Sequence, residues 1–139
     1  MSLLVIAPDA TWWRERSSAV SLDVQLRRHL HGGGGAVPLT PSACMWLAQQ
    51  DETGRDAQPN ALASAMVAFL QLPVRQLRGT ACITGWCNQR ARPLSTVQDT
   101  AFAQVLRAVQ AMPAYLSLHA QAGRVAAAWH STDDLRSTP

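Results

Sequence analysis

The stretch TACITGWCNQRARPLSTVQDTAFAQVLRAVQAMPAYLSLHA, residues 80–120, decides the fold that the sequence predicts. Its first part, Thr80–Trp86, is a short apolar run that is typical of a buried strand. Asn88–Leu94 is polar and contains a proline, so it predicts a loop. A helix is expected to begin at Ser95, because Gln98 stands three residues later as a capping-box partner.

The second half of this stretch completes a crossover unit. Five apolar residues recur at helical spacing and form one stripe: Phe102, Val105, Leu106, Val109 and Met112. Pro113 is expected to end the helix, and Tyr115–Ala120 predicts the next strand. Because such a unit usually joins parallel strands, the sequence predicts an α/β fold with a partly parallel, twisted sheet flanked by helices.

The rest of the chain adds shorter elements around this unit. Asn60 is expected to cap a helix that Pro73 ends. Two segments are ambiguous: a short strand is favoured over a helix at Leu22–Leu26, and a helix over a strand at Ala43–Gln50. Gly32–Gly35 is expected to form a flexible tether or turn. The expected elements are a strand buried on both faces at Leu3–Ala7, a short helix containing Trp12 and Trp13, and a helix at Ala61–Leu72.

The C-terminal region predicts an antiparallel hairpin. Tyr115–Ala120 and Arg124–His130 alternate so that each strand has one apolar face, with the turn at Gln121–Gly123. Residues 1–131 are therefore expected to form one α/β domain, and residues 132–139 a frayed tail.

The composition narrows the chemistry. All twelve basic residues among the 139 are arginine, and the net charge is +3. Without lysine, the chain has neither a phosphate-loop lysine nor a Schiff-base lysine. The sequence has no apolar run long enough to span a membrane and no secretory signal, and its odd number of cysteines suits reduced thiols, so a cytoplasmic location is expected.

No catalytic, cofactor-binding or metal-binding motif emerges, and the sequence predicts that the protein is not an enzyme. His31 with Gly32–Gly34 is similar to a lipase oxyanion loop, but the G-x-S-x-G nucleophile turn is absent. Cys82 and Cys87 lack a second ligand pair for zinc and are interpreted as buried structural thiols. If the protein were an enzyme, His119 and His130 would be the first residues to test.

The segment Trp12, Trp13, Arg14, Glu15 and Arg16 is the most suggestive local feature. Tryptophan and arginine are enriched where proteins bind proteins, and both stack on nucleic-acid bases. In a structural interpretation, by contrast, the two tryptophans cover opposite edges of one sheet. Trp12, Trp13, Arg14 and Arg16 are the predicted partner-binding residues.

The unit at residues 80–120 resembles the SulA family of cell-division inhibitors, and also the related ImuA proteins of damage-induced mutagenesis. Both resemble RecA cores that have lost ATPase function. The similarity is carried by an apolar strand ending in Gly85 and Trp86, and by further segments in the same order as in the family: Leu3–Pro8 with Trp12 and Trp13, the helix Ser64–Leu70, the helix opening at Leu94 and Ser95, and the strand Ala114–Leu118.

The resemblance implies a reduced RecA-like fold without nucleotide hydrolysis, because Gly85 and Trp86 stand where a RecA-like ATPase has a carboxylate. It also implies that the protein sequesters FtsZ, the division GTPase, during the DNA-damage response. Gly32–Gly35 and the missing helical region before Leu3 depart from the family and leave the partner in doubt.

Three alternatives to FtsZ inhibition stay open. One is an ImuA-like adaptor that binds RecA or a translesion polymerase. Another is a nucleic-acid-binding module that uses arginines around the central strand: Arg75, Arg78, Arg90 and Arg92. The third is a small enzyme. The sequence also leaves a homodimer open.

Overall fold

The computed structural model describes residues 1–31, 34–50, 55–73 and 76–112. The predicted C-terminal hairpin and tail, with His119 and His130, lie outside these residues. In chain order the elements are β1 (Ser2–Ile6), β2 (Trp12–Arg16), α1 (Leu22–Leu30), β3 (Gly34–Thr40), β4 (Ala43–Ala48), α2 (Ala61–Phe69), β5 (Ala81–Cys87), β6 (Arg90–Arg92) and α3 (Thr96–Gln110).

The six strands form one sheet in the order β2-β1-β5-β4-β3, with β6 paired to β5. Every pairing in it is antiparallel. The prediction of a partly parallel, RecA-like sheet is therefore wrong. The crossover argument assumed a strand after α3 that would lie parallel to β5, but the described neighbours of β5 all reach it in the opposite direction.

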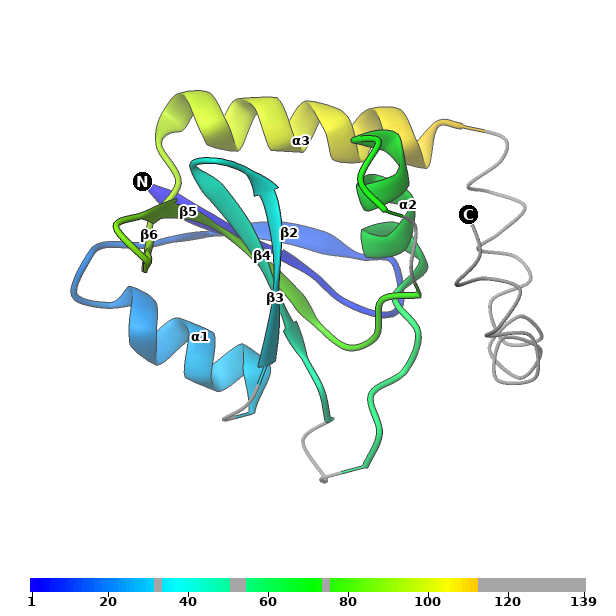
Figure 1. Ribbon diagram of the computed structural model, residues 1–139, viewed down its shortest axis with the longest axis horizontal. Coiled ribbons are helices and arrows are strands. Elements are labelled where there is room, and N and C mark those ends of the chain that lie inside the picture. The colour runs from blue at the N-terminus through cyan, green and yellow to red at the C-terminus, as the bar shows by residue number, and fades with distance from the viewer. Residues whose placement is uncertain (32–33, 51–54, 74–75, 113–139) are drawn as a thin grey trace.

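Helices cover both faces of this sheet, as Figure 1 shows. Helices α2 and α3 lie together on one face, called here the α2/α3 face. Helix α1 lies alone on the opposite one, the α1 face. Leu4, Ile6, Met45 and Ile83 are buried under α2 and α3, while Leu3 and Val5, their neighbours along β1, are buried under α1. Strand β1 is thus buried on both faces, as predicted.

Both predicted helix caps are confirmed. The Asn60 side chain accepts a hydrogen bond from the Ala63 N–H at 3.0 Å, and Ser95 and Gln98 form a complete capping box at the start of α3. Asn60 is fully buried, and its Nδ2 also donates to the carbonyl oxygens of Ile6 and Gly79. This one side chain therefore joins α2 to the sheet.

Two short segments near the N-terminus differ in type from the prediction. Trp12 and Trp13 belong to strand β2 rather than a helix, because one faces the α2/α3 side and the other the α1 side. Leu22–Leu26 begins helix α1 rather than a strand, because Leu22, Leu26 and Leu30 recur every four residues and are all buried on the sheet.

Two further segments near the β3–β4 hairpin also differ from the prediction. Ala43–Ala48 is a strand rather than a helix, since Pro41 occupies the hairpin turn before it. Gly34 and Gly35 begin β3 rather than forming a flexible turn. A Cβ at Gly34 would lie 2.7 Å from the Leu47 carbonyl oxygen, so close packing explains this glycine. Gly32 and Gly33 lie outside the described residues.

The predicted loop Asn88–Leu94 contains a tight hairpin. Asn88 and Gln89 have φ values of 52° and 62°, as the two central residues of a type I′ turn require, and β6 follows directly. In the described part of the chain, no helix is both long and apolar enough to cross a membrane.

Candidate functional site

The α1 face of the sheet is only partly covered. A helix of nine residues is about 14 Å long and about 10 Å wide, whereas five strands span roughly 19 Å. Helix α1 therefore covers β1 and part of β5 and β4. Ala36 and Pro38, which point to this face from β3, stay exposed.

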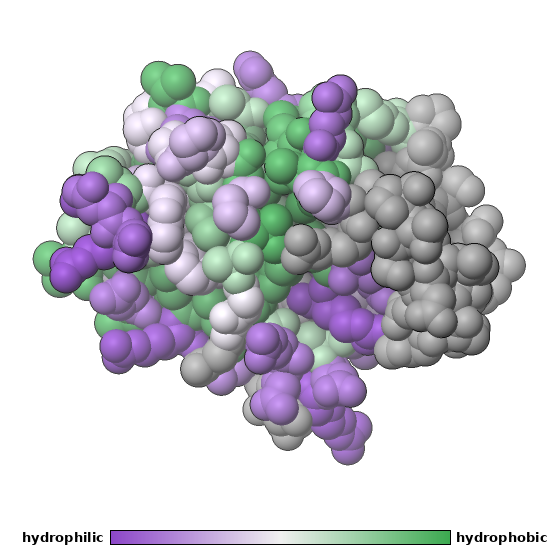
Figure 2. Space-filling view, in the orientation of Figure 1, coloured by the Kyte–Doolittle hydropathy of each residue, from purple (hydrophilic) through white to green (hydrophobic). Residues whose placement is uncertain are grey.

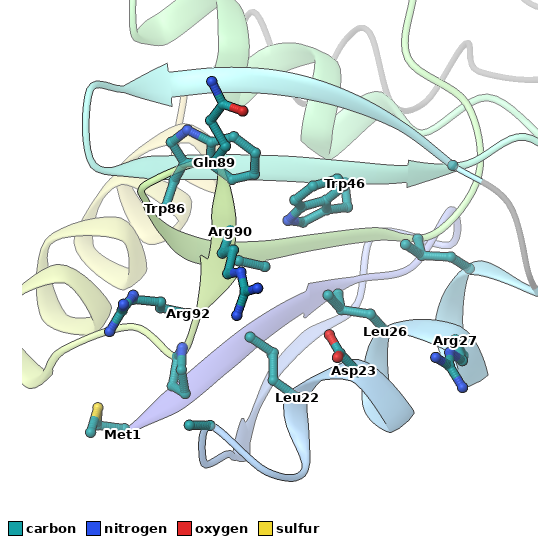
Figure 3. A pocket seen from close by; sticks show the side chains of 15 residues that line it. Met1, Leu22, Asp23, Leu26, Arg27, Trp46, Trp86, Gln89, Arg90 and Arg92 are labelled. Carbon is teal, nitrogen blue, oxygen red and sulfur yellow. The ribbon is translucent and has the colours of Figure 1, made fainter.

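A groove of about 940 Å³ opens where this cover ends. One wall is α1, with Leu22, Leu26 and Arg27, and the other is the sheet surface at β4 and the β5–β6 hairpin. In Figure 3, Leu22 and Leu26 of α1 and Arg90 of the hairpin point into the space between the walls, whereas Arg27 and Arg92 lie at its margins. Its size is within the range of small-molecule and nucleotide sites.

Two tryptophans form the aromatic part of the groove. Trp46 on β4 and Trp86 on β5 are half-buried, their ring centroids lie 5.7 Å apart and their planes are inclined by 52°. The Trp46 indole N–H donates to the Thr84 hydroxyl at 2.9 Å, which fixes that ring. Two large aromatic rings are thus held in place while part of each stays open to solvent.

The charged groups around these rings are mainly positive. Arg27, Arg90 and Arg92 line the groove together with one carboxylate, Asp23. Among the described ion pairs, which join Arg14, Arg28 and His29 to carboxylates, none involves the three groove arginines. Figure 2 shows hydrophilic side chains over β6 and α1, with neutral to hydrophobic residues between them over β3 and β4.

The position of Trp86 is set by a backbone junction. Its N–H donates to the Ser42 carbonyl oxygen at 2.8 Å, and the Gln98 side chain at the start of α3 donates to the same oxygen at 3.0 Å. The preceding Gly85 allows the chain to pass close by, because a Cβ there would lie 3.1 Å from the Pro93 carbonyl oxygen.

The residues predicted to bind a partner lie elsewhere, on edge strand β2. Trp12 and Arg14 point to the α2/α3 side. The Trp12 N–H donates to Gln110 at 3.0 Å, and the Arg107 guanidinium lies 5.6 Å from the Trp12 ring centroid. Trp13, on the α1 side, is 39% exposed. The structure therefore gives Trp12 a packing role and separates it from Trp13.

Arg14 and Asp99 form a partly buried ion pair at 2.8 Å, and the Ser2 hydroxyl also donates to Asp99. Burial by itself raises the pKa of Asp99, but the hydrogen bonds from Arg14 and Ser2 and the positive charge of Arg14 outweigh it and hold that pKa below its ordinary value. This pair ties β1 and β2 to α3.

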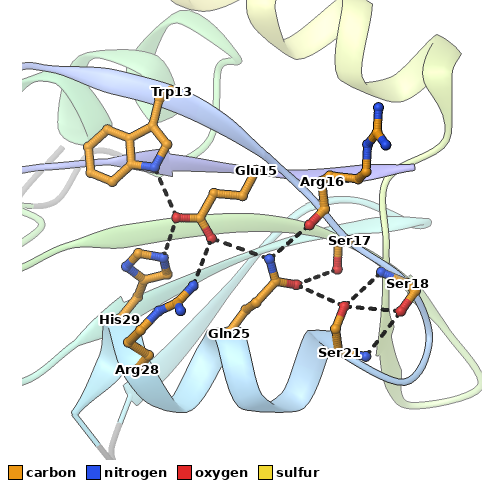
Figure 4. Close-up of polar contacts among 9 residues, drawn as sticks. All are labelled: Trp13, Glu15, Arg16, Ser17, Ser18, Ser21, Gln25, Arg28 and His29. Atoms are coloured by element: carbon orange, nitrogen blue, oxygen red, sulfur yellow. Dashed lines mark hydrogen bonds and ion pairs between the residues drawn. The ribbon is translucent and has the colours of Figure 1, made fainter.

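Glu15 is the centre of a second polar cluster, shown in Figure 4. It accepts a hydrogen bond from Trp13 at 3.0 Å and lies 2.9 Å from the His29 ring nitrogen, and Arg28 pairs with it at 3.4 Å. Burial raises the pKa of Glu15, but the bonds to Trp13 and His29 and the nearby positive charges lower it overall. The cluster fastens α1, which forms one wall of the groove, to β2.

The arginines of the predicted nucleic-acid module are separated. Arg90 and Arg92 line the groove, whereas Arg78 donates to the Ala57 carbonyl oxygen at 3.2 Å in a different region. Arg75 lies outside the described residues.

The two cysteines of β5 also have different surroundings. Cys82 is buried, and burial, with a smaller effect of the Glu15 charge, raises the pKa of its thiol to about 12. Cys87 is exposed, so the prediction of a buried thiol is wrong there, since β5 runs out of the core at its last residues. Among the described residues, no three His, Cys, Asp or Glu side chains are grouped to hold a metal.

The sequence interpretation missed Trp46, Trp86 and Arg27 as members of one site. Their only sequence signal was a pair of tryptophans inside otherwise apolar strands, and the strand register is needed to bring them together. No protein-family model matches the chain, and comparisons with curated proteins and solved structures found no significant match.

Proposed function

We propose that this protein binds single-stranded nucleic acid in the groove beside α1, without catalysing a reaction. The observation that carries the proposal is the Trp46–Trp86 pair, half-exposed and bordered by Arg90 and Arg92. Single-strand binding sites combine aromatic rings, on which bases stack, with arginines that follow the phosphates. The groove offers both at its mouth.

The chemistry of the lining supports binding rather than catalysis. The residues described around the groove include no Ser, Thr, Cys, His or Tyr, and Asp23 is their one side-chain carboxylate. A nucleophile with its own base, or a pair of carboxylates, is what acid–base or covalent catalysis requires. Arginine suits stacking and phosphate contact because its guanidinium is flat and always charged.

The predicted inhibition of FtsZ, and the alternative role as an adaptor for RecA or a polymerase, stay predictions. They followed from a resemblance that implied a RecA-like parallel sheet, and the antiparallel sheet removes that argument. A pelleting assay of FtsZ with GTP remains the direct test: unchanged polymer mass at a molar excess of this protein would reject the inhibitory role.

The proposal includes a cytoplasmic location. Single-stranded nucleic acid occurs there together with a reducing environment, which suits the thiols of Cys44, Cys82 and Cys87.

Fluorescence anisotropy with a labelled oligothymidine tests the binding. We expect Trp86→Ala to weaken binding about tenfold, since base stacking on an aromatic ring contributes about 1–3 kcal/mol. The double variant Arg90→Ala/Arg92→Ala should flatten the salt dependence by about 1.4 in the log–log slope, at about 0.7 per phosphate contact. Trp12→Phe and Arg16→Ala, which change the same residue types outside the groove and on the α2/α3 side, are the matched controls.

Other ligands serve as further arms of this experiment. A free mononucleotide should compete weakly, because it supplies one base and no continuous backbone. Duplex DNA bound as tightly as the single strand, or affinity for the oligothymidine unchanged by Trp86→Ala, would reject the proposal. Tight binding of an acidic peptide in place of the oligothymidine would instead identify the groove as a protein-binding site.

A further inference from the structure

The two edges of the sheet differ in how they are protected. At one edge, β3 carries Pro38, which has no N–H, and its register with β4 shifts between Pro38 and Thr40. Proline and register irregularities are common means of blocking an edge strand from further pairing. At the other edge, β2 has five regularly paired residues and neither device. Among the residues that the structure describes, no strand pairs with the outer side of β2, so this is the edge that can accept another strand.

The hydrogen bonds of β2 show which of its backbone groups point outward. The Ala7 N–H donates to the Thr11 carbonyl at 2.8 Å, and the Ser17 N–H donates to the Met1 carbonyl at 3.0 Å. Hydrogen-bonded pairs alternate along an antiparallel ladder. Residues 11, 13, 15 and 17 therefore bond to β1, and the backbone groups of Trp12, Arg14 and Arg16 face away from β1. The Arg16 carbonyl oxygen already accepts one bond, from the Gln25 side chain at 3.0 Å, whereas no bond to the Arg16 N–H is described.

This pattern limits the registers that an antiparallel self-pairing can take. Outward groups must meet outward groups, and of the two-fold registers that satisfy this, the one that pairs all five residues of β2 places Arg14 opposite Arg14 of the second copy. Trp12 lies opposite Arg16 of the second copy, and the reverse pair forms as well. Since directly opposed residues share a face, Trp13 and Glu15 meet on the α1 side.

The side chains of β2 are complementary in that register. Trp12 and Arg16 provide a ring and a cation on the same face, and the Trp13 indole already bonds to Glu15 within one chain. The opposed Arg14 side chains are each neutralised by Asp99 of their own chain at 2.8 Å. The charge that would otherwise repel a second copy is thereby balanced.

We propose that two copies of this chain pair antiparallel through their β2 strands, centred on Arg14, so that the two sheets become one. This interface is independent of the groove, which lies on the α1 face between α1 and the β5–β6 hairpin. A strand from another protein is the competing occupant.

Cysteine crosslinking tests the register, in a background where the exposed Cys87 is changed to serine. Opposed residues of a hydrogen-bonded pair have Cα atoms about 5.5 Å apart, within the range that a disulfide spans. Arg14→Cys should therefore form a disulfide-linked dimer under mild oxidation. Arg16→Cys, on the same face two residues along, should not, because it faces Trp12. Equal crosslinking of both variants, or of neither, would overturn the register.

Sedimentation equilibrium over a concentration series tests the pairing without crosslinks. Arg16→Pro removes an outward N–H from each copy and leaves the β1–β2 ladder intact, so the dimer should dissociate about tenfold more readily. Arg16→Gln keeps the N–H but removes the charge, and it should show a smaller change. A monomeric mass at every concentration would overturn the proposal, whereas Trp86→Ala should leave the dimer unchanged.

Discussion

Helices cover the two faces of the sheet to different extents. On the α2/α3 face, helices of nine and fifteen residues cover Leu4, Ile6, Met45 and Ile83 completely. On the α1 face, one nine-residue helix covers β1, while Trp46 and Trp86 stay half-exposed. Both faces are apolar in sequence. The difference shows that burial on one face can stabilise the fold while the other face leaves part of its apolar surface exposed.

The largest expected difference between the two faces is in the free energy of unfolding that is lost when one side chain on each face is truncated. Leu106 on α3 is fully buried, so Leu106→Ala should lower the free energy of unfolding by about 3 kcal/mol through lost burial and a cavity. Trp86→Ala should cost about 1 kcal/mol or less, because the ring is already partly in solvent. Urea unfolding at neutral pH measures both.

Leu106→Met keeps the volume and serves as the control for the first change. If Trp86→Ala destabilised the protein as much as Leu106→Ala, Trp86 would be acting as a core residue. That result would contradict the interpretation that the α1 face is only partly covered.

Acid should lower the stability of the protein at the edge of the α2/α3 face, by less than Leu106→Ala does. The pKa of Asp99 is lower in the folded protein than in the unfolded chain, so its stabilisation is present above the unfolded pKa, about 4, and is lost as the pH falls through the folded value. The urea midpoint should therefore fall as the pH drops below about 4.

Asp99→Asn should lower stability at neutral pH and flatten this acid dependence, and Arg14→Gln should remove part of the same dependence. Glu15 contributes a change of the same sign, because its pKa is also lowered. An acid profile that is identical in the wild type and in Asp99→Asn would show that this ion pair does not set it.

The smallest expected effect is at the hairpin that carries Trp86. Gln89 has a φ of 62°, a conformation that glycine adopts without strain. Gln89→Gly should therefore stabilise the protein by about 0.5 kcal/mol, since the second central position of a type I′ turn favours glycine. Ser95→Gly, at a helix cap rather than in a turn, is the contrasting control and should cost a few tenths of a kcal/mol. Urea unfolding measures both, and a loss of stability in Gln89→Gly would contradict the turn type.

Much of the fold on the α2/α3 face was predictable from local signals. Long stripes and strong caps identified α2 and α3, with Asn60 and Ser95 at their starts. The pairing direction was not predictable, because whether β5 meets parallel or antiparallel neighbours depends on strands more than thirty residues away. Short segments such as Trp12–Arg16 fit two types, and tertiary contacts decide between them.

The groove was harder to predict than the fold. Arg90 and Arg92 could be identified as basic residues near a central strand. Trp46 and Trp86 are forty residues apart, and each alone is an ordinary apolar strand residue. Their proximity is a property of the β4–β5 register and of the short length of α1, and neither is encoded in a local pattern.

The Ser42 carbonyl oxygen is a hydrogen-bond acceptor shared by groups that belong to the two faces. It accepts both the Trp86 N–H, which belongs to the groove, and the Gln98 side chain, which closes the first turn of α3. A displacement of the Trp86 backbone would therefore act on the same oxygen atom that holds the Gln98 side chain at the start of α3. A change at one side of the sheet that moved this oxygen would also change how tightly the start of α3 is held on the other side.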